Sequence, residues 1–243
     1  MKTATRAFLV LAVGVLVLVA AGVATTAPSK ERETTFGAAV HGDLTLVKRD
    51  GSTVKISFDR GTVTGKTGGS VTLERKDRKT VTSDVAPDAL VVERGVRSSL
   101  ADVAVGDHAA VFYRDGSAFL IRYHTPGQAP AASARPRAFH RPGLLRLGLM
   151  RAVVHGDFVV VKPDGTTAQI AYDRGEITAT SASSITLKRR DGQSVTLAVD
   201  SQTVVRKKGQ QGALAALAVG DRAMVFSTSG RALLIRAIRM PAP

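Results

Sequence analysis

Two His-Gly-Asp triplets are the residues of this sequence best suited to metal binding or acid–base chemistry. His41 and Asp43 recur as His155 and Asp157. On a β-strand, residues two apart face the same side, so each pair could supply two ligands to one metal ion. The competing interpretation is a tight turn, in which Gly supplies an unusual dihedral and Asp bonds the backbone. We favour the turn, and we expect no metal ion and no cofactor.

Two further carboxylates are followed by Arg-Gly. Asp59 and Asp173 fit either a cross-strand ion pair or a turn at a strand end. Carboxylates act together as general acid and base only where they converge in a cleft, which this spacing does not specify. The chain has no Cys, and no Ser stands in a nucleophile elbow. We expect no enzyme, and a metal-dependent hydrolase that uses the His-Gly-Asp triplets is the alternative.

The segment Gly61–Thr67 superficially resembles a phosphate-binding loop. Its spacing is one residue too short for that motif, and no helix follows that could present its N-terminus to a phosphate. The sequence therefore disfavours nucleotide binding.

Short basic clusters in the second half of the chain form the candidate binding surface. They consist of Lys188, Arg189 and Arg190, and of Arg206, Lys207 and Lys208. Lys and Arg number 34 against 20 Asp and Glu, a formal net charge of +14. Such an excess favours an anionic partner. Ordinary solvated hairpin ends are the competing interpretation of these clusters.

Aromatic residues are scarce, at 5% of the chain, and Trp is absent. Recognition of sugars or unpaired bases relies on exposed flat rings. Nucleic acid is therefore disfavoured as a partner.

The N-terminus has the layout of a secretory signal peptide. Lys2 and Arg6 precede the apolar run Ala7–Ala24, and small residues crowd the end of that run. We expect cleavage after Ala24 or Ala27. Because the run approaches the length that spans a bilayer, an uncleaved anchor is the alternative. Either way, we expect the remainder to be secreted or extracytoplasmic, with membrane contact only through residues 7–24.

The remainder of the chain is an internal duplication. Shifting the chain by 114 residues aligns residues 38–124 with residues 152–238 without a gap, and 39 of the 87 positions are identical. The predicted organisation is a signal peptide or anchor at 1–27, a linker at 28–37, a first domain at 38–124, a Pro/Ala/Arg-rich linker at 125–148 and a second domain at 149–240.

Each copy has the pattern of an all-β domain. In the second copy, Ser184–Arg190 alternates apolar with polar residues, and Pro163-Asp164-Gly165 and Asp191-Gly192 are turn sequences. Ala213–Leu217 is the one expected helical turn. In the first copy Asp77-Arg78 replaces Asp191-Gly192, and we expect a looser turn there. Short strands with frequent turns indicate a barrel or sandwich.

The order of these motifs resembles a bacterial domain of unknown function found in exported proteins. Its residues are Arg-Gly-x-Val-Thr, then Asp-Gly-x-x-Val-Thr-Leu, then Ala-Val-Gly-Asp and Leu-x-Ile-Arg; Arg174–Arg239 carries them best and Arg60–Tyr123 carries them with departures. The preceding Val-His-Gly-Asp resembles an extension of actinobacterial members. The resemblance implies a small OB-like barrel and no established activity.

The expected fold is therefore all-β, with two tandem small OB-like or Greek-key barrels after an N-terminal hydrophobic helix. The expected function is an exported, non-catalytic scaffold or binding module. Its partner would be an anionic envelope polymer or another protein. An extracytoplasmic nucleic-acid-binding protein is a further alternative.

Overall fold

A computed structural model describes residues 39–128, 152–207 and 209–238. Among these residues every long element is a β-strand, so the all-β prediction is confirmed. The expected signal segment at 1–27, the linker at 28–37 and the linker residues beyond 128 lie outside the described residues. None of the helices in the described part of the chain has the length and apolar character needed to cross a membrane.

The strand bounds are β1 Ala39–Val47, β2 Thr53–Lys66, β3 Ser70–Arg75, β4 Thr80–Glu93, β5 Val96–Ser98, β6 His108–Arg114, β7 Ser117–His124, β8 Val153–Val161, β9 Thr167–Thr180, β10 Ser184–Arg189, β11 Ser194–Ala198, β12 Val204–Lys207, β13 Gln210–Gly212, β14 Arg222–Thr228 and β15 Arg231–Ile238. Two 3-10 turns, η1 Leu100–Asp102 and η3 Leu214–Ala216, complete the described elements. The helical turn expected within Ala213–Leu217 is therefore present in the tighter 3-10 form.

The chain forms two compact units. Of the described residues, unit 1 contains 39–42, 56–128 and 160–167, and unit 2 contains 43–55, 152–159 and the described part of 168–238. The predicted domain boundaries at 38–124 and 149–240 stay predictions.

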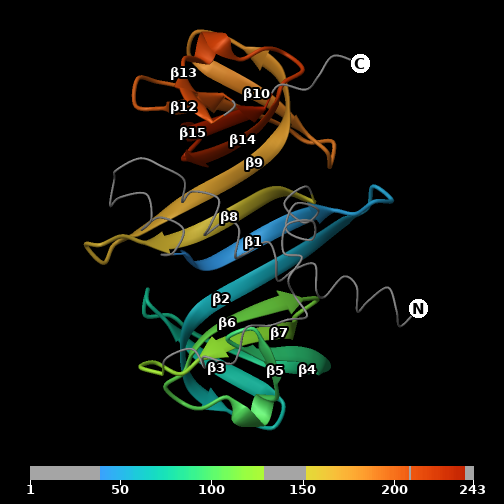
Figure 1. Cartoon of the computed structure of the whole chain (residues 1–243), viewed down its shortest axis with the longest axis vertical. Helices are drawn as coiled ribbons and strands as arrows, with labels where there is room; N and C mark the ends of the chain where they lie inside the picture. The colour runs from blue at the N-terminus through green and yellow to red at the C-terminus, as the bar shows by residue number, and fades with distance from the viewer. Residues whose placement is uncertain (1–38, 129–151, 208, 239–243) are drawn as a thin grey trace. The chain divides into compact units, whose positions relative to one another are not determined.

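The strands of unit 1 pair in a path that returns to its start. β2 pairs antiparallel with both β3 and β6, β3 pairs with β4, and β6 pairs with β7. The parallel pairing of β4 with β7 completes the path. These strands run from cyan to green in Figure 1. Both neighbours of β2 are therefore occupied along much of its length.

Unit 2 repeats the path with one interruption. β9 pairs with β10 and β14, β10 pairs with β11, and β14 pairs with β15. The position of β4 is taken by two strands, β11 and β12, both parallel to β15. Between them a turn is closed by Thr203 N–H donating to the Asp200 carbonyl at 3.1 Å.

Each unit has its own core, supplied by alternate residues of the paired strands. The unit 1 core is Val63, Val71, Leu73, Val91, Val103, Ala109, Val111, Ala118, Ile121 and Tyr123. Each of these has its counterpart, 114 residues later, in the unit 2 core. Ile185 and Leu187 have no exposed surface, as their predicted alternation requires.

The turns follow the sequence prediction closely. Gly165 and Gly192 adopt φ of +81° and +87°, and each donates its N–H to the carbonyl three residues earlier. Pro163-Asp164-Gly165 and Asp191-Gly192 are therefore turns, as expected.

The expectation of a looser turn at Asp77-Arg78 is wrong. Arg78 N–H donates to the Arg75 carbonyl at 2.9 Å, matching the 3.2 Å bond from Gly192 N–H to the Arg189 carbonyl. Arg78 reaches this geometry by adopting φ of +64°, a left-handed conformation that favours Gly. The first copy thus keeps the tight hairpin and accepts backbone strain.

We expect Arg78→Gly to stabilise the protein by about 1 kcal/mol, because Gly adopts this conformation without the steric cost of a Cβ. The reverse change at the equivalent position, Gly192→Arg, should destabilise by about the same amount. Urea denaturation of both variants measures these effects. A lower stability of Arg78→Gly than of the wild type would show that the turn is not strained.

Candidate anion-binding site

The Asp-Arg-Gly motif marks a close approach of neighbouring strands. In unit 1, Gly61 on β2 lies opposite Arg75 on β3. A Cβ added at Gly61 would lie 2.2 Å from the Glu74 carbonyl oxygen, and one at Gly175 would lie 2.3 Å from the Lys188 carbonyl oxygen. Both glycines are therefore required for strand approach.

The Asp of that motif is buried and shared between a His and an Arg. In unit 2, His155 Nδ1 donates to Asp173 Oδ1 at 2.9 Å, and an Arg189 terminal nitrogen donates to the same oxygen at 2.8 Å. Arg189 also forms a two-point ion pair with Asp191, through Nε at 3.2 Å and a terminal nitrogen at 3.0 Å. Of the two possibilities for Asp173, the cross-strand ion pair is correct.

Unit 1 contains the same chain of ionic groups. His41 Nδ1 donates to Asp59 Oδ1 at 2.9 Å, and Arg75 donates to that oxygen at 2.7 Å and pairs with Asp77. The side chains of Asp59 and Arg75 are each 6% exposed. Charged donors compensate the buried negative charge of the Asp59 carboxylate. Removal of one donor would leave that charge without full compensation and destabilise the fold.

The His-Gly-Asp triplets are not turns, so that interpretation is wrong. Both lie within strands, in β1 and β8. The Gly of the second triplet packs tightly, since a Cβ at Gly156 would lie 2.8 Å from a methyl carbon of Leu44. His155 and Asp157 face the same side, with Nε2 and Oδ2 3.0 Å apart. No cluster of three potential metal ligands occurs in the described residues.

His155 is thus held between two carboxylates, and both ring nitrogens can donate only when the ring is protonated. The hydrogen bond to Asp173 raises the pKa of His155 above its usual value, against the opposing effect of burial. Burial alone would raise the pKa of Asp173, but the bonds from His155 and Arg189 lower it. The arrangement favours an imidazolium with no lone pair for a metal or a substrate proton.

His155 should link stability to pH. Because its folded pKa is raised, its contribution is complete below the unfolded value of about 6.5 and is lost as pH rises through the folded pKa. We expect the stability difference between wild type and His155→Gln to be largest near pH ~5.5 and to shrink above the folded value. Urea denaturation across pH measures it, and a pH-independent difference would contradict the linkage.

Lys66, in the segment that resembles a phosphate-binding loop, has a structural role. Its Nζ donates to the carbonyl oxygens of Leu100, at 3.1 Å, and Ala101, both in η1. The segment itself lies mostly in β2. In unit 2 the comparable contact comes from Lys207, whose Nζ donates to the Ala216 carbonyl at 2.5 Å.

The six residues of the candidate basic surface have different surroundings. Arg189 is occupied by Asp173 and Asp191, and Lys207 also pairs with Asp221 at 2.7 Å. Lys188 and Arg190 are exposed, Arg206 is half-buried, and Lys208 lies outside the described residues. Along the pairing path, β11 and β15 separate β10 from β12. The two clusters therefore stand on non-adjacent strands, and their joint role stays a prediction.

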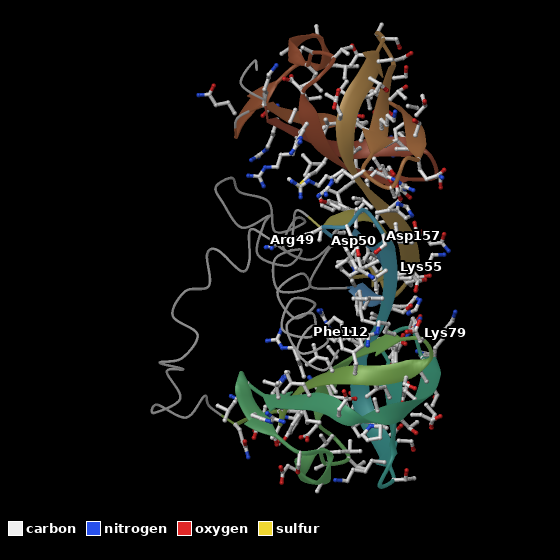
Figure 2. The ribbon with its side chains drawn as sticks, turned by 90° about the vertical axis from the view of Figure 1, so that its right-hand side faces the viewer. Arg49, Asp50, Lys55, Lys79, Phe112 and Asp157 are labelled. Carbon is white, nitrogen blue, oxygen red and sulfur yellow. The ribbon has the colours of Figure 1, made fainter. Side chains whose placement is uncertain are left out.

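Unit 1 contains a pocket of about 880 Å³ that the sequence analysis missed. Its cationic lining consists of Arg60, Arg75, Lys76, Arg78, Arg94 and Arg122, and its one lining carboxylate is Glu74. His108 and His124 also line it, with ring centroids 5.3 Å apart. Lys79, labelled in Figure 2, belongs to the same β3–β4 hairpin but is not part of the lining.

Two of the lining arginines lie on one sheet face, with a single strand between them. Arg60 on β2 is opposite Ala110 on β6, which is opposite Arg122 on β7. At about 4.8 Å between strands, the two arginine backbones are about 10 Å apart and their side chains leave the same face. Burial, reinforced by Arg122, lowers the pKa of Arg60, and burial also lowers the pKa of Arg122. Two partly desolvated guanidinium groups thus share one pocket.

The sequence contains one feature that is related to this pocket, a pair of repeated arginines. Arg60 and Arg122 recur as Arg174 and Arg236, in the same register across β9, β14 and β15. The strand register that places the two arginines on one face could not be predicted from the sequence, because it depends on which distant strands pair.

Comparisons with known proteins add no relative. Neither the protein-family models nor the curated proteins include a match to this chain.

Proposed function

We propose that the chain is an exported, non-catalytic binding module for an anionic partner, and that the pocket of unit 1 is where this partner binds. One observation carries the proposal: one pocket is lined by a single carboxylate, Glu74, and by five cationic residues besides Arg75, whose charge is held by Asp59 and Asp77. Such a lining concentrates positive potential in a concave, partly desolvated place, where an anion gains most. The net charge of +14 acts in the same direction.

The absence of catalysis is part of this proposal. It is supported by the occupancy of His155, whose two ring nitrogens both face carboxylates. A general base needs an available lone pair within reach of the substrate proton. A hydrolase built on the His-Gly-Asp triplets is therefore the weaker alternative.

We propose that each closed path of strands is a small OB-like barrel, one per copy. In unit 1 the path is β2–β3–β4–β7–β6, its parallel pair is β4 with β7, and η1 lies between β4 and β6 along the chain. This supports the proposed membership of the exported domain family of unknown function. Nucleic acid is the alternative partner that such a barrel suggests.

The aromatic content of the pocket argues against nucleic acid. Apart from its His pair, the pocket has one lining aromatic ring, Tyr123, which is 4% exposed and shares a 2.8 Å hydrogen bond with Ser98. Binding of single strands depends on rings on which bases stack. An anion recognised by charge fits the pocket better than an unpaired base.

Loss of Arg60 and Arg122 should weaken binding to a model polyanion. We expect Arg60→Gln with Arg122→Gln to lower the affinity for dextran sulfate about tenfold or more, and to make it less salt-dependent. The matched control, Lys79→Gln with Arg97→Gln, removes the same charge from exposed positions outside the pocket lining. Calorimetric titration at several salt concentrations measures both variants.

An equal loss of dextran sulfate affinity in the two double variants would show that only the net charge matters. That result would contradict binding in this pocket. Circular dichroism and thermal denaturation of each variant identify a loss that arises from unfolding instead.

Export predicts a defined mature N-terminus. We expect the protein recovered from outside the bacterial cytoplasm to begin at Thr25 or Pro28, after cleavage at Ala24 or Ala27. Intact-mass measurement distinguishes the two sites. A full-length product in the membrane fraction would indicate an anchor, and one in the cytoplasm would contradict export.

A further inference from the structure

Two arginines of the pocket hold backbone conformations that favour Gly. Arg78 has φ of +64° and Arg94 has φ of +46°. Among the described residues only four non-Gly residues have positive φ, and both arginines of that set line the pocket. The second copy has Gly192 at the position of Arg78. The hairpin turn Arg94-Gly95 accounts for the φ of Arg94, whereas the second copy avoids the strain of Arg78 altogether.

Arg94 also has an unused donor. One of its terminal nitrogens donates to the Thr125 carbonyl at 3.0 Å, while its Nε is buried without a hydrogen-bond partner. A buried donor without an acceptor costs stability. An anionic ligand in the pocket would supply the missing acceptor.

The cations reach the pocket from separate directions. Lys76 and Arg78 belong to the β3–β4 hairpin, Arg60 and Arg122 lie across β2 and β7, and Arg94 follows β4. A single small anion would contact only some of them. The arrangement suits a ligand with several anionic groups at successive positions.

We infer that this ligand is a chain of linked phosphate groups, an inference that rests on the proposed function. Apart from Arg75, which is paired with Asp59 and Asp77, four of the five lining cations are arginines, whose planar forks donate two parallel hydrogen bonds to phosphate oxygens. Consecutive phosphates place negative charge at short intervals and require no ring for stacking. A volume of about 880 Å³ holds a short segment of such a chain.

The test compares inorganic tripolyphosphate with tricarballylate, a flexible tricarboxylate, by calorimetry on the full chain. We expect tripolyphosphate to bind at least tenfold more tightly than tricarballylate. Arg78→Gly with Arg94→Gly should weaken tripolyphosphate binding at least tenfold. The melting temperature should change little, because Gly suits both conformations and so offsets the lost bond from Arg94 to the Thr125 carbonyl. Lys79→Gln with Arg97→Gln, as the charge-matched control, should change it less than threefold.

A long polyphosphate tested beside tripolyphosphate distinguishes the two sources of the same chemistry. Tighter binding per chain to the polymer assigns a polymeric ligand, and equal binding assigns a short one.

Equal affinity for tripolyphosphate and tricarballylate, or full tripolyphosphate binding by the Gly variant, would overturn the inference. If dextran sulfate binding still depends on Arg60 and Arg122, the proposed function survives that result. If neither polyanion depends on the pocket, both the inference and the proposed function fail.

Discussion

The sharing of one buried carboxylate between a His and an Arg is the interaction on which each unit depends. Asp59 joins His41 on β1 to Arg75 on β3, and Asp173 joins His155 to Arg189 in the same way. Gly61 and Gly175 let the strands that carry the Asp and the Arg approach closely. The Asp-Arg-Gly motif therefore fixes three strands, and its middle Arg is left on the opposite face.

That middle arginine connects the strand structure to the proposed binding pocket. Because side chains alternate along a strand, Asp59 points into the ionic cluster and Arg60 toward the pocket. The hairpin that ends β3 adds Lys76 and Arg78 to the same pocket. The residues that hold the strands together thus also determine where the cations stand.

Local features of the sequence predicted local structure well. Alternation predicted the buried faces of Ile185 and Leu187, and Pro-Asp-Gly and Asp-Gly predicted hairpins. Pairing between strands far apart in the chain could not be predicted from these local features. Nothing near Arg60 indicates that β7 lies two strands away. Comparison of the two copies distinguishes a basic residue with a structural role from one at the surface. Arg189 recurs as Arg75 and is an ion-pair partner, whereas Lys188, replaced by Glu74 in the first copy, is exposed.

The closed pairing path has a consequence for how the chain folds. A path that joins β2 to β6 and β4 to β7 cannot close until the last hairpin of its copy is available, and such non-local pairings form slowly. During that interval the chain holds a second set of strands with the same register, since 39 of 87 positions are identical. A strand of one copy can then pair with the partner meant for the other, which is the characteristic misassembly of tandem repeats. The copies differ at the β3–β4 hairpin, where Arg78 stands in the first and Gly192 in the second.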